Sequence, residues 1–77
     1  MIRVLLFGGL QDRAGWREKS LSFTGTLNEL RETLEKSHGL SAASDAVLFA
    51  IDGVFAQGAD TIPADAEVAI MPPVSGG

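Results

Sequence analysis

The chain has 77 residues, of which 45% are hydrophobic and 21% are charged, so one small folded domain is expected rather than a disordered segment. Six Lys and Arg against ten Asp and Glu give a net charge of −4 at pH 7, which argues against nucleic acid as a partner. The sequence has neither a run of about 18 apolar residues nor a signal-peptide pattern, so we expect a cytoplasmic chain that is not membrane-spanning or secreted.

The first third of the chain predicts two antiparallel strands joined by a loop. Residues 2–7 are apolar, rich in β-forming side chains and followed by two glycines, so they are expected to form a strand. Alternation along this strand places Arg3 on the outer face. Residues 8–16 contain three glycines and mixed charges, which predicts a loop, and residues 18–23 predict the returning strand of a hairpin.

A helix is predicted over residues 27–38. Thr26 stands three residues before Glu29, the spacing of a capping box in which each side chain binds the other residue's backbone N–H. Leucines with the spacing of one helix face follow: Leu27, Leu30 and Leu34. Gly39 supplies the left-handed residue that commonly ends a helix.

The second half of the chain predicts three further strands. Residues 47–51 and 54–55 form a small hairpin around Asp52-Gly53, a pair that favours a primed turn. Residues 67–71 alternate as the last strand, and the polar or proline-containing segments between are expected to be loops. We therefore predict an α+β roll, a mixed sheet of four to five strands with one main helix packed on one face.

Side-chain catalysis and metal binding find little support in this sequence. It has no Cys, and its one histidine, His38, falls in the last turn of the predicted helix, where an imidazole interacts favourably with the helix dipole. The carboxylates fall mostly in turns, so no metal site is expected. They are Asp45, Asp52, Asp60, Asp65 and Glu67. Gly8-Gly9 lacks the Lys-Ser/Thr and following helix of a phosphate loop, which predicts a simple turn.

The last residues combine a stiff exit with a terminus that lacks side chains. Two prolines, Pro72 and Pro73, end the final strand because proline has no N–H to donate. We expect a domain over residues 1–72 and a tail that comprises Pro73, Val74, Ser75, Gly76 and Gly77. Five extended residues reach about 16 Å, and the glycines add only backbone bulk, so this tail can enter a narrow channel in another protein.

Several stretches together carry a family resemblance. They are Val4-Leu5-Leu6-Phe7-Gly8, Gly15, the helix start Thr26-Leu27-x-Glu29-Leu30, and the ending Glu67-Val68-Ala69-Ile70-Met71-Pro72-Pro73-Val74-Ser75-Gly76-Gly77. The chain is similar in these to the small subunit of molybdopterin synthase, a family of ubiquitin-like sulfur carriers. The resemblance implies a ubiquitin-like β-grasp fold. The family usually has Gly-Asp where this chain has Asp65-Ala66, and Val-Asn where it has Ile51-Asp52. Both replacements are still compatible with turns at these positions.

The resemblance also implies a function for Gly77. In that family the C-terminal glycine is adenylated by an E1-like partner enzyme that uses ATP, and a sulfur donor system then converts it to a thiocarboxylate. The tail enters the active site of the large synthase subunit, within a heterotetramer, where its sulfur builds the dithiolene of molybdopterin. The chain would thus be a non-catalytic subunit that binds no cofactor itself. Its chemistry agrees, because a carboxylate must be activated before a sulfur nucleophile can attack it.

A docking face is expected beside the tail. The resemblance implies that the first and last strands are parallel neighbours, so their outward side chains would form an apolar patch of the kind found at interaction sites. These side chains are Leu5, Phe7, Ala69 and Met71. Trp16 is expected to pack against the fold instead.

Two other functions stay open. The chain could carry sulfur for another pathway, such as that of the thiamin thiazole, with the same chemistry and a different acceptor. It could also be a ubiquitin-like modifier whose Gly77 forms isopeptide bonds with target lysines. Pro72-Pro73-Val74 ahead of the glycines favours the molybdopterin pathway by resemblance, and a bound large subunit or lysine conjugates would separate the possibilities.

Overall fold

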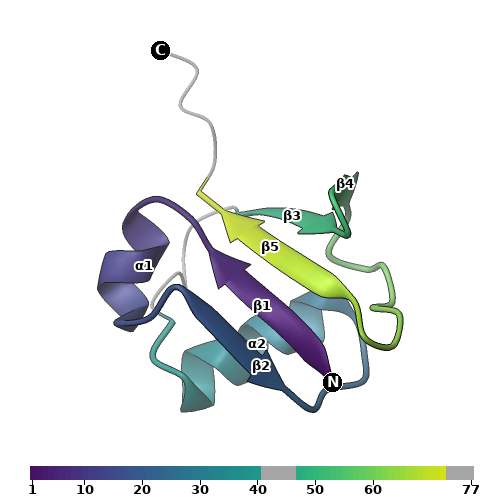
Figure 1. The fold of residues 1–77 in the computed structure, drawn as a ribbon, viewed down its shortest axis with the longest axis horizontal. Helices are drawn as coiled ribbons and strands as arrows, with labels where there is room; N and C mark the ends of the chain where they lie inside the picture. The colour runs from purple at the N-terminus through teal and green to yellow at the C-terminus, as the bar shows by residue number, and fades with distance from the viewer. Residues whose placement is uncertain (41–46, 73–77) are drawn as a thin grey trace.

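A five-stranded mixed sheet, crossed on one face by one long helix, makes up the fold (Figure 1). The computed structural model describes residues 1–40 and 47–72. In chain order the elements are β1 (Ile2–Leu6), α1 (Gly9–Ala14), β2 (Glu18–Leu21), α2 (Leu27–Ser37), β3 (Leu48–Ile51), β4 (Val54–Ala56) and β5 (Glu67–Met71). The strand order β2-β1-β5-β3-β4 confirms the predicted α+β roll.

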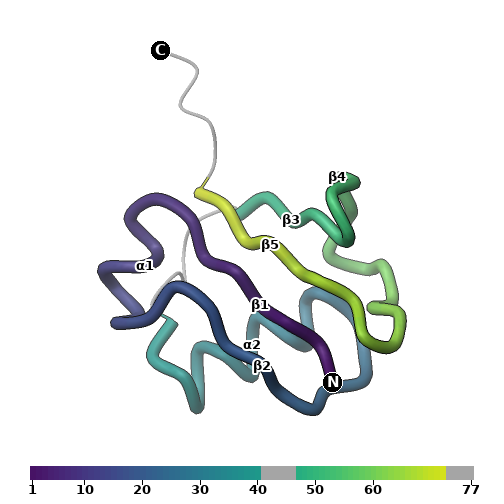
Figure 2. The backbone as a smooth tube through the Cα atoms, in the orientation of Figure 1, coloured from purple at the N-terminus to yellow at the C-terminus, as the bar shows by residue number. Residues whose placement is uncertain are grey.

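The first and last strands are neighbours inside the sheet. β1 and β5 run parallel, side by side in Figure 2, and the other three strand pairs are antiparallel. Parallel strands cannot be joined by a tight turn, so the chain between them must cross over the sheet, and α2 lies in that crossover. The antiparallel β1–β2 pairing and the parallel β1–β5 pairing are both as expected.

The core lies between α2 and one face of the sheet. Leu27, Leu30 and Leu34 of α2 are each 0% exposed and belong to one apolar cluster with the sheet. The sheet residues in this cluster are Ile2, Val4, Leu6, Phe49, Val68 and Ile70. Since the sequence has no Cys for a disulfide, burial of these side chains is the main source of stability.

Helix α2 begins and ends where local signals predict. The Thr26 hydroxyl oxygen accepts from the Glu29 N–H at 3.2 Å, and the Thr26 N–H donates to Glu29 Oε1 at 2.8 Å, which completes the capping box. The helix ends at Ser37, one residue earlier than predicted, because His38 has φ −128° and serves as the C-cap. Gly39 follows with φ +74°, the left-handed conformation expected of it.

The prediction of a loop over residues 8–16 was wrong for its central part, which forms α1. This helix has only 6 residues, starts with glycine and has no side-chain cap, so its local signals are weak. Its support is tertiary: Leu10 is 4% exposed, and the Gln11 side-chain amide donates to the Leu6 carbonyl at 2.8 Å. Short helices depend on such packing, which residue spacing alone does not reveal.

Three predicted strand ends differ by one residue: β1 ends at Leu6 rather than residue 7, β3 begins at Leu48 rather than residue 47, and β4 ends at Ala56 rather than residue 55. β2 ends at Leu21, two residues earlier than predicted, because Leu21 already pairs with Ile2 at the start of β1. The predicted primed turn is confirmed, since Asp52 and Gly53 have φ of +49° and +84°. Asp65 adopts φ +59°, a conformation that Asp tolerates better than most residues. Neither described helix is long and apolar enough to span a membrane.

Candidate functional site

The candidate site is the sheet face opposite α2, together with the end of β5 that leads to the tail. The structure brings the predicted docking residues together there. Leu5 and Ala69 are register partners in the parallel β1–β5 pair. Phe7 directly follows β1, is 44% exposed, and donates its N–H to the Ile70 carbonyl at 3.1 Å. Met71, like Leu5 and Ala69, is half-buried.

Strands β3 and β4 extend this surface with side chains that sequence reasoning missed. The register pairs Leu48 with Met71, Ala50 with Ala69, and Phe55 with Ala50, and paired residues place their side chains on the same face. Phe55 is 74% exposed, whereas Ala50 is 8% exposed and contributes little accessible surface. We call the combined surface the outer apolar face: Leu5, Phe7, Leu48, Ala50, Phe55, Ala69 and Met71. Residues 48–51 are all apolar, so their pattern shows neither which side chains face outward nor that β3 lies beside β5.

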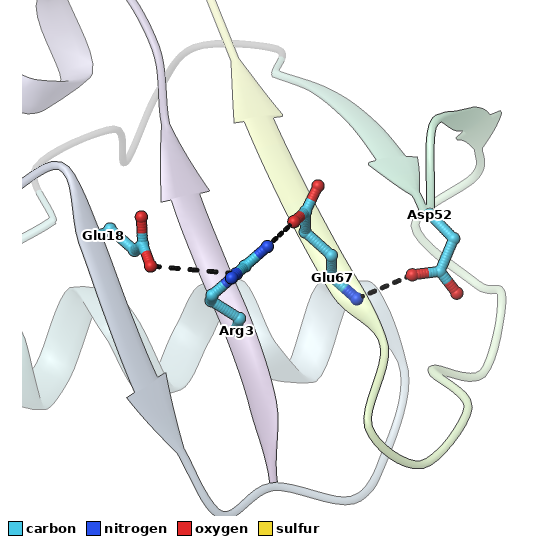
Figure 3. A network of polar contacts seen from close by, with 4 residues as sticks. All are labelled: Arg3, Glu18, Asp52 and Glu67. Atoms are coloured by element: carbon cyan, nitrogen blue, oxygen red, sulfur yellow. Dashed lines mark hydrogen bonds and ion pairs between the residues drawn. The ribbon is translucent and has the colours of Figure 1, made fainter.

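Charged groups bound the outer apolar face near the start of β5 (Figure 3). The Arg3 guanidinium donates a hydrogen bond to the Glu67 carboxylate and lies 3.7 Å from Glu18 Oε2. The hydrogen bond to Glu67, followed by the negative charges of Glu67 and Glu18, raises the pKa of Arg3. Asp52 braces the same point, because its Oδ1 accepts from the Glu67 N–H at 2.9 Å. The apolar side chains of the face therefore lie toward the end of β5, which leads to Pro72.

The predicted tail lies outside the described residues. Pro72 is exposed and is the last residue that the structure describes. The assignments of Pro73, Val74, Ser75, Gly76 and Gly77 as an entering tail, and of residues 1–72 as the folded domain, stay predictions.

His38 and Trp16 have structural roles at the C-terminal end of α2, away from the outer apolar face. The Trp16 indole N–H donates to the His38 carbonyl at 2.6 Å, and His38 Nδ1 lies 3.5 Å from Lys19 Nζ. Lys19 Nζ also lies 5.0 Å from the centre of the Trp16 ring, within the range of a cation–π interaction. Trp16 packs against the core, as predicted. Within residues 1–40 and 47–72, no three His, Asp or Glu side chains gather closely enough to hold a metal ion.

Comparison with known protein families shows which family the chain belongs to. Residues 4–77 match the ThiS family. The chain belongs to this family. Over 81 residues it is 33% identical to a molybdopterin synthase sulfur carrier subunit from Caenorhabditis briggsae, a match that covers 99% of this chain and 96% of that protein.

Solved structures share the fold across nearly the whole chain. Small archaeal modifier protein 1 from Methanosarcina acetivorans is 26% identical with a TM-score of 0.73, and the match covers 99% of this chain and 95% of that one. A complex of subunits 1 and 2 of molybdopterin-converting factor from Helicobacter pylori contains a chain that is 21% identical with a TM-score of 0.70, covering 99% of this chain and 97% of that one. The predicted ubiquitin-like β-grasp fold is confirmed.

Proposed function

We propose that this ThiS-family chain is the sulfur carrier subunit of a molybdopterin synthase and that Gly77 carries the sulfur. The observation that supports this most directly is the 33% identity to the Caenorhabditis briggsae carrier subunit over nearly the full length of both chains. A backbone carboxyl group at the end of a tail needs no catalytic side chain in its own domain. The sequence, which has no Cys and a single His, suits such a carrier.

The proposed loading reaction has two steps. The Gly77 carboxylate attacks the α-phosphate of ATP in an activating enzyme, which forms a glycyl adenylate and releases pyrophosphate. Hydrosulfide, or a donor that delivers sulfur at the same oxidation level, then attacks the carbonyl carbon of Gly77. The C–S bond forms as the bond to AMP breaks, a proton is released, and the terminus becomes a thiocarboxylate.

In the proposed unloading step, the thiocarboxylate sulfur attacks a carbon of the pterin precursor held by the large subunit. A C–S bond forms while that carbon's bond to its oxygen leaving group breaks. Water then cleaves the thioester, which leaves the sulfur on the product and restores the Gly77 carboxylate. Because a dithiolene contains two sulfur atoms, each product would consume two loaded carriers.

The outer apolar face is the proposed docking surface for the large subunit. Phe7 and Phe55 expose aromatic side chains on it, and aromatic residues and Met are enriched at protein interfaces. The face adjoins the end of β5, so a partner bound there would sit next to the start of the tail. The relative solved with its second subunit is consistent with such an assembly.

The test is the intact mass of the protein after incubation with ATP, sulfide and a carrier-activating enzyme. We expect the mass gain of one oxygen exchanged for sulfur in the full chain, and no gain in a chain that lacks Gly77. Adding the large subunit and pterin precursor should return the carrier to its original mass as molybdopterin forms. An unmodified full chain, beside a different carrier that the same enzyme loads, would contradict the proposal.

A protein modifier is the second candidate, because the Methanosarcina acetivorans relative is a small archaeal modifier protein. In that case Gly77 would become linked to lysine amines of other proteins. The last Lys or Arg of the chain is Lys36, so a tryptic digest would leave residues 37–77 attached to each modified lysine, and mass spectrometry would detect that branched peptide. Loading without transfer to the pterin precursor would instead favour a carrier for a different acceptor, such as a thiazole precursor.

A further inference from the structure

We propose that Gly8 is a positioning residue that seats the Pro72 ring and so sets where the tail leaves the fold. This inference rests on the proposed function, in which the tail delivers sulfur. The sequence suggested only a turn at Gly8-Gly9, and the carrier chemistry assigns no role to either glycine.

The backbone at Gly8 takes a conformation suited to glycine. Its φ of +61° and ψ of −143° are close to the mirror image of polyproline II, which a residue with a Cβ adopts only with strain. Both sides of this turn are anchored. Phe7 donates its N–H to the Ile70 carbonyl at 3.1 Å, and the Gln11 N–H donates to the Gly8 carbonyl at 3.2 Å.

The missing side chain leaves room for Pro72. A Cβ added to Gly8 would lie 3.0 Å from Cγ and 3.4 Å from Cδ of the Pro72 ring. The first distance is closer than carbon atoms normally approach. A proline ring cannot rotate away as a flexible side chain can, because it is closed onto its own backbone nitrogen. A side chain at Gly8 would therefore require a change in the pucker of the Pro72 ring, or a shift of Pro72 or of the turn by a few tenths of an ångström.

This contact joins the proposed docking face to the start of the tail. Phe7 belongs to the outer apolar face, and the Pro72 ring lies over the next residue, Gly8, at the position that a Cβ would approach to 3.0 Å. Residues 73–77 follow Pro72. When a partner holds Phe7, the Gly8–Pro72 contact determines where the tail starts relative to that partner. Misplacement of reacting groups by about 1 Å can slow a reaction on the order of 100-fold, so a small shift at Pro72 is costly even when docking is intact.

Single-turnover sulfur transfer tests this inference. The full chain is prepared as its thiocarboxylate, bound to the large subunit with the pterin precursor, and the rate of molybdopterin formation is measured at saturating carrier. We expect Gly8→Ala to lower this rate about tenfold or more while the carrier concentration for half-saturation changes by less than about threefold.

Gly15→Ala is the matched control. Gly15 also has a positive φ, +83°, but a Cβ there would have no neighbour within 4 Å. It should lower the melting temperature less than Gly8→Ala does, because its φ of +83° and ψ of +12° are left-handed helical values that alanine adopts at modest cost, and it should transfer sulfur within about twofold of the wild-type rate. Equal transfer rates for the two variants would overturn the inference.

Pro72→Ala approaches the contact from the other side and, because Pro72 is exposed, should fold even if Gly8→Ala does not. This variant lacks the ring that packs over Gly8, so we expect sulfur transfer to be several-fold slower with little change in melting temperature. Adding Gly8→Ala to Pro72→Ala should slow transfer no further, since nothing is left to collide. A Pro72→Ala variant that transfers at the wild-type rate would contradict the inference. Failure of the wild-type thiocarboxylate to transfer any sulfur would instead contradict the proposed function.

Discussion

Leu5 of β1 lies directly opposite Ala69 of β5 in the parallel pair at the centre of the sheet. This pairing brings the beginning of the chain against its last strand. It places the exposed Phe7 close to the end of β5 and the start of the proposed tail. The proposed docking surface and the proposed tail therefore adjoin the same two strands.

Phe7→Asp should weaken binding of the large subunit about tenfold or more, because a charge would have to be buried in an apolar interface. Phe7 is 44% exposed, so stability should change by less than about 0.5 kcal/mol. Isothermal titration calorimetry and urea unfolding measure the two effects. Met71→Asp should weaken binding as well, although Met71 is half-buried.

Val54→Asp is the control for docking. Val54 is 69% exposed but pairs with Ile51, which packs against the core, so it does not belong to the outer apolar face. Its substitution should leave the affinity within about twofold of wild type, a change of roughly 0.4 kcal/mol. Equal loss from Val54→Asp and Phe7→Asp would mean that the partner responds to added charge rather than to this face.

Thr26→Ala should destabilise the domain by about 1 kcal/mol, because it removes the side-chain acceptor of the capping box. For a domain of this size that corresponds to a drop of about 4–8 °C in Tm. Circular dichroism during heating provides the measurement, and Thr24→Ala, at an exposed site before the helix, is the control. An unchanged Tm in Thr26→Ala would show that tertiary packing alone holds the start of α2.

Asp52→Ala should cost about 1–2 kcal/mol, since it removes the side-chain acceptor of the Glu67 N–H and places alanine at φ +49°. Asp65→Ala, at φ +59°, carries similar backbone strain without exposing a strand N–H, so it should cost less. Asp52→Asn keeps the acceptor oxygen and should be nearly neutral. Urea unfolding compares the three variants, and a larger loss for Asp65→Ala would disprove the role assigned to the Asp52 side chain.

Trp16→Phe should lower stability by about 1 kcal/mol, because the His38 carbonyl loses its indole donor and Lys19 loses the better π-system. His38→Ala should cost less, since the carbonyl that accepts this bond belongs to the backbone. Chemical denaturation followed by circular dichroism makes the comparison, because Trp16 is the single tryptophan and its removal abolishes the fluorescence signal. A greater loss from His38→Ala would place the main contact in the imidazole.

Prediction from sequence succeeded where a signal lies within a few residues. The Thr26 and Glu29 pair, the leucines that follow and the Asp52-Gly53 turn each depend on neighbours along the chain, and each was placed correctly. The helix α1 was missed for the opposite reason. It is stabilised by the burial of Leu10 in the core and by the Gln11 hydrogen bond to the Leu6 carbonyl. Both contacts depend on how β1 and the rest of the core are packed, which the local sequence does not show.

The sequence by itself determined the α+β class, the main helix, the strands and the alternation that turns Leu5 and Phe7 away from the core. Only the tertiary structure decided that β3 lies beside β5, which adds Leu48, Ala50 and Phe55 to the outer apolar face. It also decided that the Pro72 ring lies where a side chain at Gly8 would approach it. The physical reason is that strand formation follows from local residue pattern, whereas strand order and ring-to-backbone contacts depend on how distant segments pack around a shared core.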